Sequence, residues 1–453
     1  MTQEHSWRLN PSEQHEASYH RLAASIAVDG TEQIITGKKI CIVTQLHSSM
    51  NPRVVKEADA LSKAGYQVSI IAPEFSEWGK LQDKAFEHRL WRIVARPQFG
   101  PRATRIARLR EFARRTLAQI ALSIIGTRSM TVAIAACHPV APLLVAATKR
   151  QSADLYIAHY PSALAAVAIA ARRHNALYAF DAEDFHQGDL PSTPEHESAK
   201  QVISRIESAY LPGCCYVSAA APGIAQAYAD TYAIQRPITI RNVFPKRNAP
   251  TAPTPKGNAL LGPSIYWYSQ TIGHDRGLQC AIRAISRAAT QPHLYLRGAV
   301  SGSIRKNFEA IARECNVLNR LHFLPPEPPN MMEQLASLYD VGLCGEIGAT
   351  ENRKIALTNK QFTYLLAGIP VLMSDITAHR DFRKDAIDAV ALFAVNDADS
   401  LAQTIDHVLG DLDRLAFMRA SAWRYGQMKF NWDTEQGILL DQVQRVLNAK
   451  FKP

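Results

Sequence analysis

A lysine at the start of a predicted helix gives the strongest chemical signal in this chain. Lys360 lies in the first turn of the segment 359–367, which has helical spacing. Gly368 is predicted to end this helix, and a buried strand over 371–374 follows. Thr358 is predicted as the N-cap. The helix dipole disfavours a cation in the first turn, where free backbone N–H groups attract anions. Lys360, with Asn359 beside it, therefore predicts a phosphate site, and the alternative is an exposed lysine in water.

Apolar strands and amphipathic helices alternate on both sides of this segment. In the first half, strands are predicted over 38–44, 66–72, 155–158, 177–180, 215–217 and 238–241. In the second half, they are predicted over 265–268, 293–297, 321–324, 341–344 and 371–374. This alternation indicates parallel sheets. We expect an α/β protein with two doubly wound Rossmann-like domains that face each other across a cleft, where the carboxyl ends of the strands bind ligand.

Length and composition divide the chain into regions. A chain of 453 residues with 47% apolar and 20% charged residues is typical of a soluble protein of two or three domains. A segment rich in Pro, Ala and Gly follows Pro245 and is predicted to be a linker. The expected order is a flexible extension 1–37, a first domain 38–245, a linker 246–263, a second domain 264–430 and a C-terminal helix 431–453.

Composition also excludes several classes of protein. The seven cysteines show no CxxC spacing, so neither a zinc site nor a disulfide framework is predicted. The polar start lacks the apolar region of a signal peptide, and a cytoplasmic location is expected. The apolar run 130–148 contains two prolines and is predicted to be a buried helical segment rather than a membrane span.

Positive charge is concentrated in residues 101–150. This segment holds nine arginines and lysines and one glutamate, and the whole chain has a net charge of +10. Its only aromatic ring among Phe, Tyr and Trp is Phe112, so we expect no nucleic-acid partner, which would need broader basic patches with interleaved aromatics.

Several stretches, in order, resemble one family of enzymes. They are 42–68, 154–159 (DLYIAH), 178–186 (YAFDAEDFH), 268–278, 321–343 and the stretch around Lys360. Together they resemble the GT-B glycosyltransferases, most closely the retaining, nucleotide-sugar-dependent enzymes of family 4, over about 38–446. The resemblance implies an acceptor-side first domain, a nucleotide-sugar-binding second domain and a C-terminal helix that crosses back to the first domain.

The resemblance assigns roles on the donor side. Arg276 and Lys360 are expected to bind the pyrophosphate, with Gly273 and Gly277 allowing close backbone approach. Glu346 is expected to bind hydroxyls of the donor sugar, and Glu351 competes for this role.

The second glutamate of the family motif, a ribose ligand, is replaced here by Thr363. A threonine cannot accept two ribose hydroxyls as a carboxylate does. Either Glu351 or a backbone group binds the ribose in place of that glutamate, or the donor binds in a different way. The sequence therefore does not identify the nucleotide base.

On the acceptor side, the resemblance places His159 near the donor sugar and the acceptor, and a structural histidine is the alternative. Asp181 and Glu183 follow the next strand, and Glu183 stands where relatives often have histidine. Asn51 and Arg53, in the first loop, are further candidates for contacts to phosphate or acceptor. The acidic residues around Asp181 and Glu183 suggest a metal site as an alternative. The family does not generally need a metal ion, so neither metal nor cofactor is expected.

These observations predict a hexosyltransferase-like enzyme that moves a sugar from a nucleoside-diphosphate sugar to an acceptor with retention. The alternatives are a noncatalytic nucleotide-sugar-binding subunit, favoured by the missing glutamate, and a GT-B nucleotide-sugar epimerase. Arg102, Arg105, Arg108 and Arg115 are predicted to share one helical stripe, with apolar residues opposite, as in a helix on an anionic membrane. A solvated basic face is the alternative. We therefore expect a lipid-linked or cell-envelope glycan acceptor and peripheral attachment to the inner face of the membrane.

Overall fold

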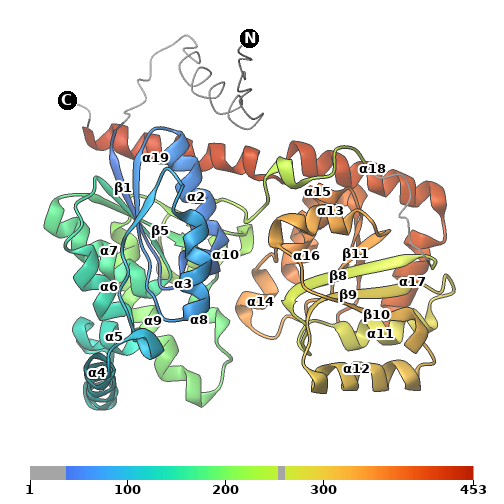
Figure 1. The fold of residues 1–453 in the computed structure, drawn as a ribbon, viewed down its shortest axis with the longest axis horizontal. Coiled ribbons are helices and arrows are strands. Elements are labelled where there is room, and N and C mark those ends of the chain that lie inside the picture. The colour runs from blue at the N-terminus through green and yellow to red at the C-terminus, as the bar shows by residue number, and fades with distance from the viewer. Residues whose placement is uncertain (1–36, 254–260, 452–453) are drawn as a thin grey trace, which may run out of the picture. The chain divides into compact units, whose positions relative to one another are not determined.

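The computed structural model describes residues 37–253 and 261–451, so most of the predicted extension and part of the predicted linker lie outside the described residues. The described residues form one compact unit. It contains two parallel sheets, of seven and six strands, with helices between successive strands (Figure 1). The predicted α/β class with two doubly wound domains is confirmed.

The first sheet has the strand order β3-β2-β1-β4-β5-β6-β7. Its strands are β1 Lys39–Val43, β2 Gln67–Ile71, β3 Arg92–Ala95, β4 Leu155–His159, β5 Leu177–Ala182, β6 Val217–Ala219 and β7 Ile238–Thr239. The helices of this domain are α2 Pro52–Lys63, α3 Glu77–Asp83, α4 Arg105–Ile125, α5 Met130–Cys137, α6 Ala141–Thr148, α7 Pro161–His174, α8 His186–Asp189, α9 Pro194–Tyr210 and α10 Pro222–Tyr232.

The second sheet has the strand order β10-β9-β8-β11-β12-β13. Its strands are β8 Ser264–Thr271, β9 His293–Ala299, β10 Leu321–Leu324, β11 Val341–Cys344, β12 Val371–Ser374 and β13 Val390–Phe393. Its helices are α11 Leu278–Arg287, α12 Gly302–Glu314, α13 Met332–Ala336, α14 Glu351–Ile355, α15 Lys360–Ala367, α16 Thr377–Asp385, α17 Ala398–Leu409 and α18 Leu412–Met428, followed by α19 Trp432–Phe451.

Central strands are apolar on both faces because helices cover both sides of each sheet. In β1, Ile40 and Ile42 pack in the same core cluster as Val54 of α2. The alternate residues Cys41 and Val43 pack in another cluster with α6 and α7. This burial fixes the strand register, and with it the side chains that emerge at the carboxyl edge.

Helix α19 returns to the first domain. Its first residue, Trp432, donates its N–H to the carbonyl of Phe244 at 2.8 Å, and Glu435 accepts from the N–H of Arg241 at 2.8 Å. Leu439 and Val443 of α19 share the apolar cluster that contains α2. The last helix of the chain is therefore part of the core of the first domain.

Several boundaries differ from the sequence prediction. The short strands β3 and β13 were not predicted. Helix α9 begins at Pro194, and its first turns are polar and show no apolar period. The N-cap of α15 is Asn359 rather than Thr358, whose hydroxyl contacts Gln361 at 3.0 Å. Gly368 ends the helix with φ 75°, as predicted.

The apolar run 130–148 forms two helices rather than one segment. The helices α5 and α6 bend by 112° at the break between them. Within the described ranges, no single helix is long and apolar enough to cross a membrane, and this bent pair is the one candidate by length and composition.

Candidate functional site

Three charged side chains that the sequence predicted separately meet beside the second sheet. Glu346 lies two residues after β11, Arg276 lies just before α11, and Lys360 is the first residue of α15. Arg276 Nη1 is 3.5 Å from Glu346 Oε2, and Lys360 Nζ is 3.5 Å from Glu346 Oε1. Three of the four residues predicted as catalytic therefore form one cluster.

Strand order and a close approach of two loops explain this cluster. β11 pairs in parallel with β8 and β12, so the loops after β8 and β11 leave the sheet at its carboxyl edge. Gly277 has φ 68°, and a Cβ at this position would lie 2.2 Å from the carbonyl oxygen of Gly345. Glycine at 277 thus lets the two loops meet and brings Arg276 to Glu346. A Cβ at Gly273 would meet no atom within 4 Å, so packing does not require glycine there.

The electrostatics of the cluster favour an anion. Burial opposes ionisation of Glu346, but Lys360 and Arg276 outweigh it and hold its pKa below the usual range. The carboxylate is therefore charged at neutral pH and is shared by two cations. Glu346 is 5% exposed and Arg276 is 32% exposed, so the guanidinium is the part that solvent reaches. A phosphate can pair with both cations and leave Glu346 free to accept hydroxyl groups.

Two residues that the sequence analysis missed hold the Glu346 loop. Ser374 donates its hydroxyl to the backbone carbonyl of Glu346 at 2.5 Å, and His379 Nδ1 donates to the carbonyl of Ser374 at 2.7 Å. Burial lowers the pKa of His379 to about 4, so the ring is neutral. The only sequence signal for His379 is its place shortly after the end of a strand.

Thr363, predicted at the ribose position, is fully buried and hydrogen-bonded within the protein. It donates to Glu333 Oε1 at 3.0 Å, and Tyr268 donates its hydroxyl to Thr363 at 2.8 Å. Burial raises the pKa of Glu333 to about 7. Its Oε2 has no hydrogen-bond partner in the described part of the chain. A carboxylate therefore does lie beside Thr363. It belongs to Glu333 of α13 and not to Glu351 of α14.

Glu351, the other candidate for a donor contact, lies on α14 and does not join the cluster. Its side chain is 64% exposed and pairs with Lys354 at 2.7 Å. Asn359, by contrast, lies next to Lys360 and accepts the first backbone hydrogen bond of α15, from Thr363 N–H. Of Glu351 and Asn359, only Asn359 lies beside the cluster.

Helix α14 joins the two domains through a residue that the sequence analysis did not single out. Asn352 donates to Asp184 at 2.8 Å and Asp189 at 3.0 Å, and its oxygen accepts from the N–H of Phe185 at 2.8 Å. Nearby, a Cβ on Gly223 would lie 2.9 Å from Ile355. A helix of five residues has too few turns to show an apolar period, so no signal marked it.

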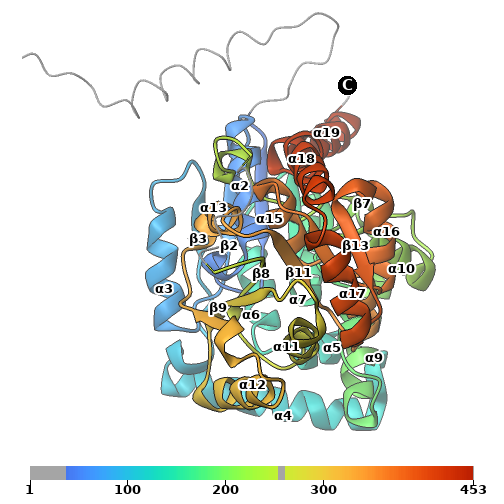
Figure 2. The same ribbon diagram turned by 90° about the vertical axis from the view of Figure 1, so that its right-hand side faces the viewer.

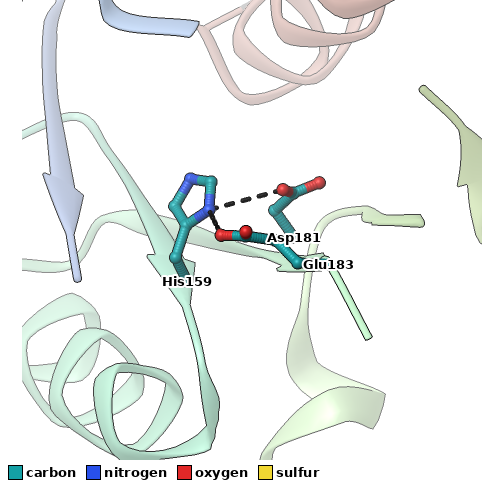
Figure 3. A group of neighbouring side chains, drawn as sticks. All are labelled: His159, Asp181 and Glu183. Atoms are coloured by element: carbon teal, nitrogen blue, oxygen red, sulfur yellow. Dashed lines mark hydrogen bonds and ion pairs between the residues drawn. The ribbon is translucent and has the colours of Figure 1, made fainter. Parts of the chain in front are cut away.

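On the first sheet, the predicted acceptor-side residues form a buried charge cluster. Arg53 makes two hydrogen bonds to the carboxylate of Asp181 and donates to the carbonyl of Ile240 at 2.7 Å. Glu183 Oε1 accepts from Asn51 Nδ2 at 2.5 Å and from His159 Nδ1 at 2.9 Å. Figure 3 shows the carboxylates of Asp181 and Glu183 on the same side of the His159 ring, both facing Nδ1.

His159 is held from both sides of its ring. Its Nε2 lies 2.7 Å from Glu57 Oε2, opposite the contact with Glu183. Burial disfavours the charged ring, but Glu183 and Glu57 outweigh burial and raise the pKa of His159 to about 10. His159 is thus an imidazolium at neutral pH, so it cannot take a proton from a substrate. Glu57 was missed by the sequence analysis, although it lies four residues after Arg53 on one face of α2.

The same residues can be tested as a metal site. The ligand atoms of His159, Asp181 and Glu183 lie within 4.8 Å of one another. However, an imidazolium has no free lone pair, and Asp181 already binds the Arg53 guanidinium through both oxygens. The donor set therefore fits a hydrogen-bonded charge cluster better than a metal ion.

The predicted membrane arginines fall into two groups. Arg102 lies in the short turn Gly100–Arg102 before α4 and pairs with Glu74 at 2.8 Å and with Glu77, which differs from the expected single stripe. Arg105, Arg108 and Arg115 lie on α4 and are exposed. The charge of Arg102 is thus largely neutralised by local acids, whereas the others face solvent.

Two hollows of the described structure lie away from these clusters. One, of about 660 Å³, is lined by residues of α17, α18 and β13, among them His407 and Arg414. The other, of about 470 Å³, lies between α12 and the edge strand β10. Neither is lined by a predicted site residue. We assign the site from the strand ends, because the converging charges lie there.

Comparison with known proteins identifies the fold. No family model and no curated protein matches the chain. Among solved structures, Anabaena HepE in complex with UDP is similar, with a TM-score of 0.64 and 14% identity over 90% of this chain and 100% of that chain. Sucrose-phosphate synthase from Thermosynechococcus elongatus has a TM-score of 0.67 and 14% identity over 91% of this chain and 100% of that one. The lipopolysaccharide outer core galactosyltransferase WaaB, in its apo form, has a TM-score of 0.57 and 12% identity over 91% of this chain and 100% of that chain. At these identities the likeness concerns the fold, which is GT-B, as the sequence resemblance predicted.

Proposed function

We propose that this GT-B chain transfers a sugar from a nucleoside-diphosphate sugar to an acceptor. The observation that carries the proposal is the cluster of Arg276, Lys360 and Glu346 at the carboxyl edge of the second sheet. Two fixed cations suit the diphosphate that leaves when the glycosidic bond breaks, because negative charge grows on the leaving oxygen in the transition state. Similar structures include one solved with UDP-glucose, which supports a sugar nucleotide as the ligand class.

In this proposal each residue of the cluster has a separate task. Arg276 and Lys360 bind phosphate oxygens, and Glu346, released from its ion pairs, accepts hydrogen bonds from hydroxyls of the donor sugar. The acceptor hydroxyl attacks the anomeric carbon on the face from which the diphosphate departs, so configuration is retained. The acceptor proton passes to the departing phosphate, so the reaction needs no protein base. This suits a site where His159 is already protonated.

The acceptor that we propose is a lipid-linked or cell-envelope glycan at the inner face of the membrane. Support comes from α4, whose arginines and apolar side chains are exposed to solvent. A lipid-linked acceptor requires the enzyme to work at a bilayer surface.

The central experiment measures binding and turnover separately. A thermal-shift panel of nucleoside diphosphates and their sugars should give one clear rise in melting temperature, since a ligand at about 100 times its Kd stabilises a protein by about 2.7 kcal/mol. The stabilising sugar nucleotide should then release free nucleotide when glycan lipid is added, and NMR of the product should show the donor's anomeric configuration. A panel in which no nucleotide shifts the melting temperature would refute the proposal.

A noncatalytic sugar-nucleotide-binding subunit is the second candidate. The observation that favours it is Thr363, which is closed off by Tyr268 and Glu333 at the position where the family has a glutamate. Such a subunit would give the thermal shift without any release of nucleotide. Interconversion of the sugar without an acceptor would instead indicate an epimerase.

A further inference from the structure

Helix α4 has two apolar faces, and only one of them packs against the protein. Ala118 is 6% exposed on the inner face, towards α5. On the other face, six large apolar residues are exposed by 51 to 75%: Ile106, Leu109, Phe112, Leu117, Ile120 and Ile124. We call these six residues the outer stripe.

The outer stripe runs the length of the helix. Its members recur every three to five residues, which keeps them on one side of a helix with 3.6 residues per turn. The helix has 21 residues and is therefore about 30 Å long. In Figure 1 it is seen nearly end on at the margin of the first domain, and in Figure 2 it is seen along its length. An apolar stripe of this length on a surface indicates a binding face.

Positive charge borders the outer stripe. Helical spacing places Arg108 and Arg115 along one flank and Arg110 along the other, and Arg105 lies at the first residue of the helix, on the side of the stripe itself. All four arginines are exposed. The only acid of the helix, Glu111, accepts from the N–H of Gly100 and lies away from the stripe. The stripe therefore lies between basic flanks, whereas the sequence alone predicted arginines on one side and apolar residues on the other.

We propose that α4 lies flat in the headgroup layer of an anionic lipid bilayer, with the outer stripe towards the acyl chains and the flanking arginines at lipid phosphates. A bilayer interface accommodates an apolar stripe bordered by cations, because the arginines snorkel to the phosphates. Pairing with a second copy through the stripe would set the two sets of arginines against each other without acids to neutralise them. Charge complementarity thus favours anionic lipid over a second copy of this chain.

The start of α4 is linked to the carboxyl edge of the first sheet. α4 follows β3, whose carboxyl end lies at the same edge of the parallel sheet as His159 and Asp181. Docking through α4 would therefore place that edge near the bilayer surface. The docking proposal depends on no step of sugar transfer, so each can fail without the other.

Binding is tested with the full chain and sedimented vesicles. Vesicles of phosphatidylcholine with a third of phosphatidylglycerol should carry the protein into the pellet at low salt, and phosphatidylcholine alone should not. Binding to the anionic vesicles should fall in about 1 M salt, where the Debye length shrinks to about 3 Å. Wild-type protein that stays in the supernatant with anionic vesicles at low salt would overturn the proposal.

Matched variants separate the two parts of the surface. Changing Arg105, Arg108 and Arg115 to Gln should weaken binding by roughly 100-fold, since each basic residue at such a surface contributes about a fivefold factor. The control changes Arg305, Lys306 and Arg313 of α12 to Gln and should bind like wild type. If the control weakens binding as much as the α4 variant, general surface charge and not α4 is responsible.

The outer stripe has its own control. Changing Leu117, Ile120 and Ile124 to Gln should reduce binding at least about tenfold. Ile387, Leu412 and Phe417 have similar exposures of 55, 59 and 58% in the second domain, and their change to Gln should have no effect. The alternative is that the outer stripe binds a second copy of this chain. If wild type forms a dimer, and changing Leu117, Ile120 and Ile124 to Gln dissociates the dimer but does not alter vesicle binding, the lipid proposal is wrong.

A depth probe tests insertion directly. Phe112→Trp should gain fluorescence that brominated lipids quench, relative to the same measurement on wild type. Phe417→Trp, at an exposed position of α18, should gain fluorescence without quenching. Equal quenching of both added tryptophans, or of neither, would contradict insertion through α4.

Discussion

His159 Nδ1 lies 2.9 Å from Glu183 Oε1, and Asn51 donates to the same oxygen. The other oxygen, Oε2, has no hydrogen-bond partner in the described part of the chain, and the Glu183 side chain is 16% exposed. Glu183 is the only carboxylate of this cluster with appreciable exposure, since those of Glu57 and Asp181 are 6% and 3% exposed. His159 and Asn51 thus hold one oxygen of Glu183 and leave the other available to a ligand.

This geometry predicts the effect of Glu183→Gln. Two donors fix the side-chain oxygen, so the amide NH2 would take the place of Oε2 and could not accept a hydrogen bond from an acceptor hydroxyl. Transfer to acceptor should fall about 10- to 100-fold, as expected for a lost hydrogen bond of about 1–3 kcal/mol. Nucleotide affinity and slow donor hydrolysis should be unchanged. Glu351→Gln, at an exposed glutamate, is the control, and equal losses in both variants would exclude this role for Glu183.

Lys360→Ala and Arg276→Ala should each lower turnover by roughly two orders of magnitude, if each cation contributes about 2–3 kcal/mol to the transition state. Both should also weaken binding of the diphosphate. Circular dichroism should show that both variants fold. Lys354→Ala is the control, because its ammonium pairs with Glu351 at the surface and lies outside the cluster. Wild-type turnover in both variants would remove these residues from the site.

The charge of His159 has a direct signature. Its pKa is raised to about 10, so its ring nitrogens should both carry protons at pH 8 in an NMR spectrum of ¹⁵N-histidine protein. A raised folded pKa stabilises the fold fully below the unfolded value of about 6.5, and this stability is lost as pH rises through about 10. The stability difference between wild type and His159→Gln should therefore shrink between pH 7 and pH 10. A His159 signal that titrates near 6.5 would show that the carboxylates do not control the ring.

Asn352 is predicted to be the main polar contact of α14 with the first domain. Asn352→Ala should lower the melting temperature, because it leaves the half-buried Asp184 and the N–H of Phe185 without their partner, and losing a hydrogen bond costs about 0.5–1.5 kcal/mol. The lost contact to Asp189 should matter less, because that side chain is exposed. Asn352→Asp keeps the size but adds a third carboxylate, so it should be less stable than the alanine variant. Hydrogen exchange should increase in α8 and α14 in both variants. If Asp is as stable as Asn, the contact has little energetic weight.

Local position in the sequence was enough to predict which residues lie together beside the second sheet. Arg276, Glu346 and Lys360 each lie next to the end of a strand or the start of a helix, and a parallel sheet brings such positions to one edge. Sequence could not predict which long-range partners the other residues take. His159 binds Glu57, 102 residues away, and Thr363 binds Glu333, which lies on a helix of only five residues. Such pairs depend on packing in three dimensions, for which one chain has no periodic signal.

The return of α19 to the first domain constrains how the protein is made. Trp432 lies under the ammonium of Lys56, 5.2 Å from its ring centre, and Val443 and Leu447 complete the apolar cluster that contains α2. The residues of α2 are synthesised long before those of α19, so this face of α2 is covered only after α19 has left the ribosome. Until then an apolar surface stays exposed, and such surfaces on nascent chains bind chaperones or aggregate. Packing of the first domain is therefore complete only after α19 has been synthesised and has returned to it.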